Sequence, residues 1–123
     1  MRFGSAALFD FALRLTLAIP VAYHGAWNLG ADGAQWWVES SGLPVPLRLL
    51  VGGAELAAAL SLVTGVLSRL AAVGLTIIFA GAIPQHWGQG YSFKHGGWEP
   101  VLVYAMLALL IALRPKPQQQ PAR

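Results

Sequence analysis

The sequence predicts an all-α integral membrane protein built as a bundle of four transmembrane helices. Of its 123 residues, 56% are hydrophobic and only 11% are charged, whereas soluble domains usually carry about 25% charged residues. A soluble chain this short buries too small a fraction of its surface to hide so many apolar side chains. In a bilayer those side chains face lipid instead. The length allows one domain, expected over residues 1–114.

The first predicted span covers about residues 6–27, and the second covers about 47–66. Each has close to the length of about 20 apolar residues that a helix needs to cross the hydrocarbon core. Residues 28–46 between them contain several glycines and prolines, so we predict a long loop there.

The third predicted span covers about 70–87, after a tight turn, and the fourth covers about 98–113. Residues 101–113 have no polar face, whereas the helices of soluble bundles carry a polar face opposite an apolar stripe. This difference disfavours a soluble all-α bundle. The polar residues 115–123 are predicted to form a disordered cytoplasmic tail.

The basic residues predict the orientation of the chain. Arg2, Arg69 and Arg114 lie on one side of the predicted spans, opposite the loops 28–46 and 88–97. Cytoplasmic loops carry an excess of Lys and Arg. We therefore expect both termini in the cytoplasm and a multi-pass protein of the prokaryotic plasma (inner) membrane. The lipid bilayer is one partner, and nucleic acid is not, because the eight basic residues form no continuous patch.

Small residues recur at every fourth position along the second predicted span. A ridge of this kind lets helix backbones approach closely in a membrane. This predicted helix-packing ridge consists of Gly53, Ala57, Ser61 and Gly65.

All five tryptophans fall on the predicted outer side of the membrane. Two interpretations are open: the rings anchor the outer loops at the headgroups, or they line a docking surface or ligand mouth. The first is favoured because interfacial tryptophan is common. The residues are Trp27, Trp36, Trp37, Trp87 and Trp98.

Two charged residues, Arg14 and Glu55, fall well inside predicted spans, where ionisable groups are costly and point to function. In antiparallel helices their backbones differ in depth by only about 6 Å. A pair between Arg14 and Glu55 is therefore geometrically easy, although the sequence alone does not show whether it forms. Such a pair would fix the register of two helices, or it would bind a polar ligand head or relay a proton; the structural role is favoured.

A second polar group is expected near the outer edge, from His24, Asn28, His86 and Glu99. Together these residues would enclose a pocket able to hydrogen-bond quinone carbonyls and exchange protons. The alternative is that Glu99 caps its helix and the histidines are interfacial. No cofactor motif is evident. Haem ligation by His24 and His86 is disfavoured, and no metal site is expected because no element shows ligand spacing.

Several short motifs follow one another at defined spacing. Arg14 is followed ten residues later by residues 24–28 (HGAWN), and Glu55 is followed by residues 64–72 (TGVLSRLAA). Their order and spacing over nearly all of 8–114 resemble the DoxX family of small four-helix membrane proteins.

The resemblance implies the fold and several functions. Some DoxX relatives are the small membrane subunit of thiosulfate:quinone oxidoreductase, and others look like anchors or partners of redox and detoxification proteins. We therefore expect a redox-associated membrane subunit that handles a quinone together with a partner protein. The alternative is a non-enzymatic structural or assembly subunit; a small transporter ranks last. Asn28 stands where many members have lysine, so any role of that lysine toward an anionic substrate is absent.

Overall fold

The computed structural model describes residues 4–115, which contain five α-helices and no strand. The predicted all-α class is confirmed for this part of the chain. Apart from Pro115, the predicted tail lies outside the described residues, as does Arg2. The elements are α1 (Ser5–Leu29), α2 (Ala31–Glu39), α3 (Leu47–Thr64), α4 (Ser68–His86) and α5 (Glu99–Leu113), with short 3-10 turns at Trp87–Gln89 and Phe93–His95.

Each of the four predicted spans corresponds to one long helix. By length and composition, α1, α3 and α4 are able to cross a membrane, whereas α5 is apolar but has only 15 residues. Large apolar side chains face outward along all four helices; Ile19, Leu50, Ile77 and Leu110 are each more than 60% exposed. Such a surface suits lipid and would be unstable in water. The chain is an integral membrane protein with several apolar helices.

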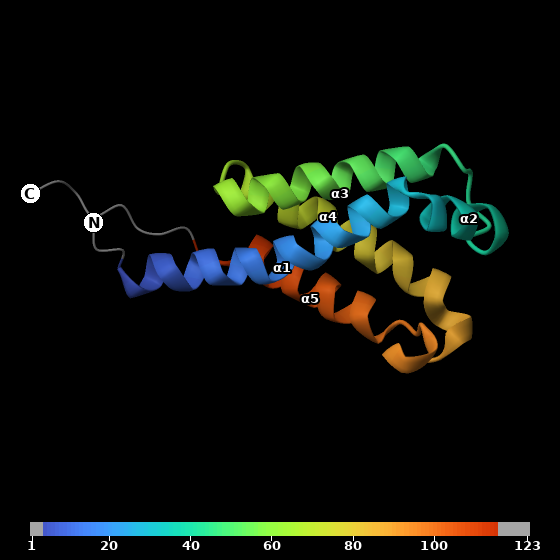
Figure 1. Ribbon diagram of the computed structural model, residues 1–123. Coiled ribbons are helices and arrows are strands. Elements are labelled where there is room, and N and C mark those ends of the chain that lie inside the picture. The colour runs from blue at the N-terminus through green and yellow to red at the C-terminus, as the bar shows by residue number, and fades with distance from the viewer. Residues whose placement is uncertain (1–3, 116–123) are drawn as a thin grey trace, which may run out of the picture.

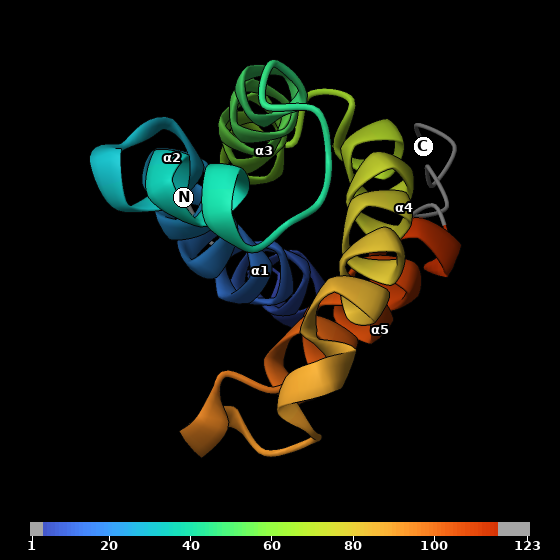
Figure 2. The same cartoon turned by 90° about the vertical axis from the view of Figure 1, so that its right-hand side faces the viewer.

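The helices form two pairs (Figures 1 and 2). α1 lies along α3, and α4 lies along α5; the pairs meet near the two ends of the described chain and diverge toward α2. The buried contacts between the pairs involve Leu17, Leu62, Leu75, Ala108 and Ile111, all fully buried.

The close approach of α1 and α3 depends on two glycines. A Cβ added to Gly25 would lie 3.0 Å from the carbonyl oxygen of Gly52 and 2.9 Å from Cγ of Leu56. A Cβ added to Gly52 would lie 3.1 Å from the carbonyl oxygen of Gly25. Only hydrogen atoms fit at these two positions, so the backbones touch where any other residue would separate them.

The predicted ridge therefore does not form this helix contact. Gly53 faces open space, and Gly65 lies beyond the last turn of α3. Ala57 and Ser61 line a groove between α3 and α4. The face of α3 that packs inward carries Gly52, Glu55 and Leu62, and it lies on a different side of the helix from Gly53 and Ala57.

The predicted loop 28–46 contains a helix, α2, that the sequence analysis missed. Gly33 packs against the last turn of α1; a Cβ there would lie 2.8 Å from Cα of Asn28. Trp37, one helical turn later on the same face, is also buried. This helix is short, and the surrounding glycines and prolines concealed its amphipathic pattern.

An ion cluster joins the helices at the end of the bundle that holds both ends of the described chain. One carboxylate oxygen of Asp10 lies 2.9 Å from Nε of Arg14, and the other lies 2.9 Å from Nε of Arg114. Arg114 also donates to Oγ of Ser68 at 2.9 Å. The carboxylate thus links α1, the start of α4 and the residue after α5. We call this end the terminal end and the opposite one the α2 end.

Candidate functional site

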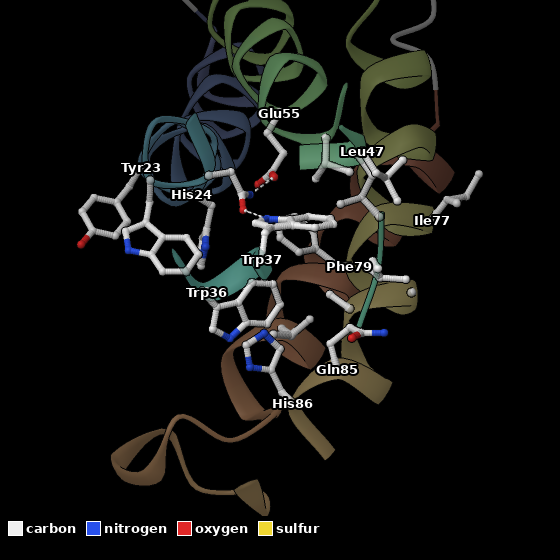
Figure 3. A pocket seen from close by; sticks show the side chains of 18 residues that line it. Tyr23, His24, Trp36, Trp37, Leu47, Glu55, Ile77, Phe79, Gln85 and His86 are labelled. Atoms are coloured by element: carbon white, nitrogen blue, oxygen red, sulfur yellow. Dashed lines mark hydrogen bonds between the residues drawn. The ribbon is translucent and has the colours of Figure 1, made fainter. Parts of the chain in front are cut away.

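A cavity of about 460 Å³ lies between the two helix pairs, near the α2 end (Figure 3). Its volume is within the range of about 300–1,000 Å³ that is typical of small-molecule sites. Most of its wall is apolar or aromatic. The aromatic and polar lining residues are Tyr23, His24, Trp27 and Asn28 from α1, Trp36 and Trp37 from α2, Glu55 from α3, and Phe79, Gln85 and His86 from α4.

A chain of buried hydrogen bonds forms one wall of the cavity. The amide nitrogen of Asn28 donates to Oε1 of Glu55 at 2.7 Å, and its amide oxygen accepts from Nε1 of Trp37 at 2.8 Å, as the dashed lines in Figure 3 show. The backbone carbonyl of Asn28 also accepts from Arg48 at 2.9 Å. Asn28 therefore holds α2 and α3 to α1, and it fixes the carboxyl group of Glu55 at the cavity wall.

The pair of Arg14 and Glu55 that their depth allows does not form. Arg14 pairs with Asp10, one helical turn earlier, and donates to the carbonyl of Leu62 near the end of α3. Leu62 lies seven residues beyond Glu55 on α3, which is about 10 Å along the helix axis. Depth alone suggested the pair, but a carboxylate four residues away on the same helix face is the nearer partner.

The two membrane histidines reach the cavity from different helices. The ring of His24, on α1, contacts Tyr104 edge-on at 5.6 Å and Phe79 edge-on at 6.2 Å between centroids. The ring of His86, on α4, stacks on Trp36 at 5.8 Å with an interplanar angle of 12° (Figure 3). Nδ1 of His86 lies 3.2 Å from the carbonyl oxygen of Gly96. Aromatic packing thus orients both imidazoles at the cavity.

Glu99 does not line the cavity. Its Oε2 accepts a hydrogen bond from the backbone N–H of Phe93 at 3.2 Å, and it opens the first turn of α5. Its role is therefore to hold the segment before α5. The residues of the predicted polar site that share the cavity are His24, Asn28, Glu55 and His86, whereas Arg14 and Glu99 lie elsewhere.

The tryptophans divide into two groups. Trp27, Trp36 and Trp37 line the cavity, whereas Trp87 and Trp98 stack on each other at 5.1 Å before α5. The sequence analysis missed other aromatic lining residues, above all Phe79 and Tyr23. Phe79 had one usable signal, because it precedes His86 by seven residues and so lies on the same face of α4.

The comparison with protein families adds the decisive observation: the family model described as DoxX matches residues 9–88. The chain belongs to the DoxX family. No curated protein and no solved structure matches it. The DoxX match includes His24, Asn28, Glu55 and His86, so these cavity residues belong to the DoxX domain.

Within residues 4–115, no group of three His, Cys, Asp or Glu side chains is placed to hold a metal ion. The lining of the cavity includes two imidazoles, one carboxyl group and several aromatic rings.

Proposed function

We propose that this DoxX protein is a redox-associated membrane subunit that binds a quinone, or a similar lipid-soluble carrier, in the cavity at the α2 end. The observation that supports this function is an aromatic cavity inside an apolar helix bundle, with hydrogen-bonding groups from three helices. A flat, lipid-soluble ring with polar edges matches both properties of the site.

The residues present fit such a carrier. The rings of Trp36 and Phe79 offer flat surfaces, and His24, His86 and Glu55 offer hydrogen bonds to carbonyl or hydroxyl groups. When bound, the carrier supplies the electron and proton transport. Of the chain's own groups, the imidazoles of His24 and His86 orient the ring edges and hold or deliver protons. The sequence contains no cysteine for a dithiol relay, so a partner protein exchanges the electrons.

The proposed membrane arrangement follows from charge and helix length. Arg69 and Arg114 lie at the terminal end, which we place in the cytoplasm of a prokaryotic cell, in its plasma membrane. α5 forms the fourth span, because snorkelling of Arg114 extends its effective length. The cavity then lies in the outer half of the membrane and is reached from that side.

Quinone binding is testable in nanodiscs with decylubiquinone and the fluorescence of the cavity tryptophans. We expect saturable quenching by decylubiquinone in the original protein. His86→Leu should weaken binding about tenfold, because it removes a hydrogen-bonding group worth about 1.4 kcal/mol. The matched control is His95→Leu in the exposed turn before α5, which should bind as before. Quinone concentrations are expressed per lipid, so that partitioning does not imitate binding. Quenching that does not saturate, or that is equal in the two variants, would exclude the proposed site.

A second function, that of a non-enzymatic structural or assembly subunit, is favoured by the outward-facing ridge. Ala57 and Ser61 line a groove of about 270 Å³ between α3 and α4. Small residues on an exposed helix face allow another membrane helix to approach closely. In this case Ala57→Leu abolishes co-purification of a stoichiometric partner in mild detergent. Quenching by decylubiquinone is then the same in Ala57→Leu as in the original protein, whether or not the original protein shows any. Retention of the partner by Ala57→Leu argues against an interface at this groove.

A further inference from the structure

We propose that the cavity also binds hydrophobic organic cations, with the carboxylate of Glu55 as their counter-charge. This goes beyond the quinone function, since a quinone ring is neutral whereas this second class of ligand carries a permanent positive charge.

The first argument is the lack of charge compensation at Glu55. The residue is only 2% exposed and lies in the middle of α3, at the cavity wall. The ion pairs that form among residues 4–115 join Asp10 to Arg14 and Arg114, so Glu55 has no basic partner in that range. Its one hydrogen bond comes from the neutral amide of Asn28. A carboxylate removed from water is costly unless a positive charge accompanies it, and a cationic ligand supplies that charge.

The basic and titratable groups around the cavity are engaged elsewhere. Arg48, on the same helix, donates to the backbone carbonyl of Asn28. His86 stacks on Trp36 and contacts the carbonyl of Gly96, and His24 packs among aromatic rings. None of these side chains forms an ion pair with Glu55. Among the residues that line the cavity, Glu55 carries the only carboxyl group, and none is a lysine or an arginine.

The second argument is the aromatic character of the walls. Ring faces carry negative electrostatic potential and attract cations, and aromatic cages are the usual receptors for quaternary ammonium groups. Trp27, Trp36, Trp37, Tyr23 and Phe79 all line the cavity. A calcium ion fits poorly, because calcium needs about six to eight oxygen ligands, and the amide oxygen of Asn28 is already bonded to Trp37. The walls therefore match a cation with a large apolar body.

The probes for this inference are tetraphenylphosphonium and tetraphenylborate, which have the same shape and opposite charge. Binding is measured by isothermal titration calorimetry on the full chain in nanodiscs of zwitterionic phosphatidylcholine. We expect saturable binding of the phosphonium and none of the borate. Glu55→Gln should weaken phosphonium binding at least about tenfold, because the counter-charge is lost. Glu39→Gln is the matched control, since Glu39 is exposed on α2, and it should bind as the original protein does.

Two results would overturn the inference: equal binding of borate and phosphonium, or unchanged phosphonium binding in Glu55→Gln. If Glu55→Gln does not fold, Trp36→Leu is compared with Trp87→Leu, which changes a tryptophan outside the cavity. Only Trp36→Leu should then weaken phosphonium binding, and equal binding by the two variants would also overturn it. Decylubiquinone quenching is measured on the same samples. A protein that binds decylubiquinone but not phosphonium retains the quinone function and refutes this inference alone.

Discussion

Replacing Asn28 with leucine is expected to lower the free energy of unfolding by about 2–6 kcal/mol, because two buried partners lose their hydrogen bonds at about 1–3 kcal/mol each. Those partners are the carboxyl group of Glu55 and the indole N–H of Trp37. Leucine has the branched shape of asparagine in a larger side chain, and it has neither of the polar groups. Unfolding is followed by circular dichroism in mixed micelles with increasing SDS. Hydrogen exchange should also rise across α2, since its main polar contact with α1 is gone.

The matched control is Gln35→Leu on α2. This amide also donates to a glutamate, Glu39, at 3.2 Å, but the pair is exposed. Surface substitutions usually change stability by less than about 0.5 kcal/mol, so this variant should unfold as the original does. Equal stability of the Asn28 and Gln35 variants would mean that the buried hydrogen bonds of Asn28 contribute nothing to the free energy of unfolding. The position of Glu55 at the cavity wall would then need another explanation.

Replacing Gly25 with valine is expected to destabilise the bundle by about 2–3 kcal/mol, because overpacking of a close contact typically costs about 1–3 kcal/mol. The new side chain would begin 3.0 Å from the backbone oxygen of Gly52, which cannot rotate away. α1 and α3 must then separate, and the hydrogen bond from Asn28 to Glu55 lengthens as they do. The same SDS unfolding measurement reports the loss.

Gly53→Val is the control for this substitution. Gly53 is adjacent to Gly52 on α3, but a Cβ there meets nothing within 4 Å. The two variants therefore introduce the same side chain near the same depth, one between helices and one toward lipid. Similar unfolding midpoints for Gly25→Val and Gly53→Val would show that α1 and α3 do not depend on the glycine contact.

The long helices were predictable because hydropathy is a local property. The segments about 6–27 and 47–66 are apolar whatever packs against them, and they become α1 and α3. α2 was not predictable by the same means. Its buried face consists mainly of Gly33 and Trp37, and a glycine gives no hydrophobic signal even though its missing side chain permits the contact.

The residue types of the candidate site were predictable from the sequence. Which of the candidate residues share the cavity was only partly predictable. Polar residues inside apolar segments are rare, so His24, Glu55 and His86 attracted attention without any structure. Glu99 resembled them in depth, but its carboxylate turns to the backbone of Phe93. Position along a helix gives depth, whereas the direction of a side chain depends on which helix lies beside it.

By itself, the sequence determined that the chain is a multi-helix membrane protein of the DoxX family, with a few polar residues placed where lipid makes them costly. Only the tertiary structure decided the partners: Asn28 rather than Arg14 for Glu55, and Gly52 rather than Gly53 at the contact with α1. The physical reason is that the hydropathy of a segment alone decides whether that segment enters a bilayer. Hydrogen bonds and backbone contacts depend on the rotation and crossing of two helices, and a change of one residue turns a side chain by about 100°.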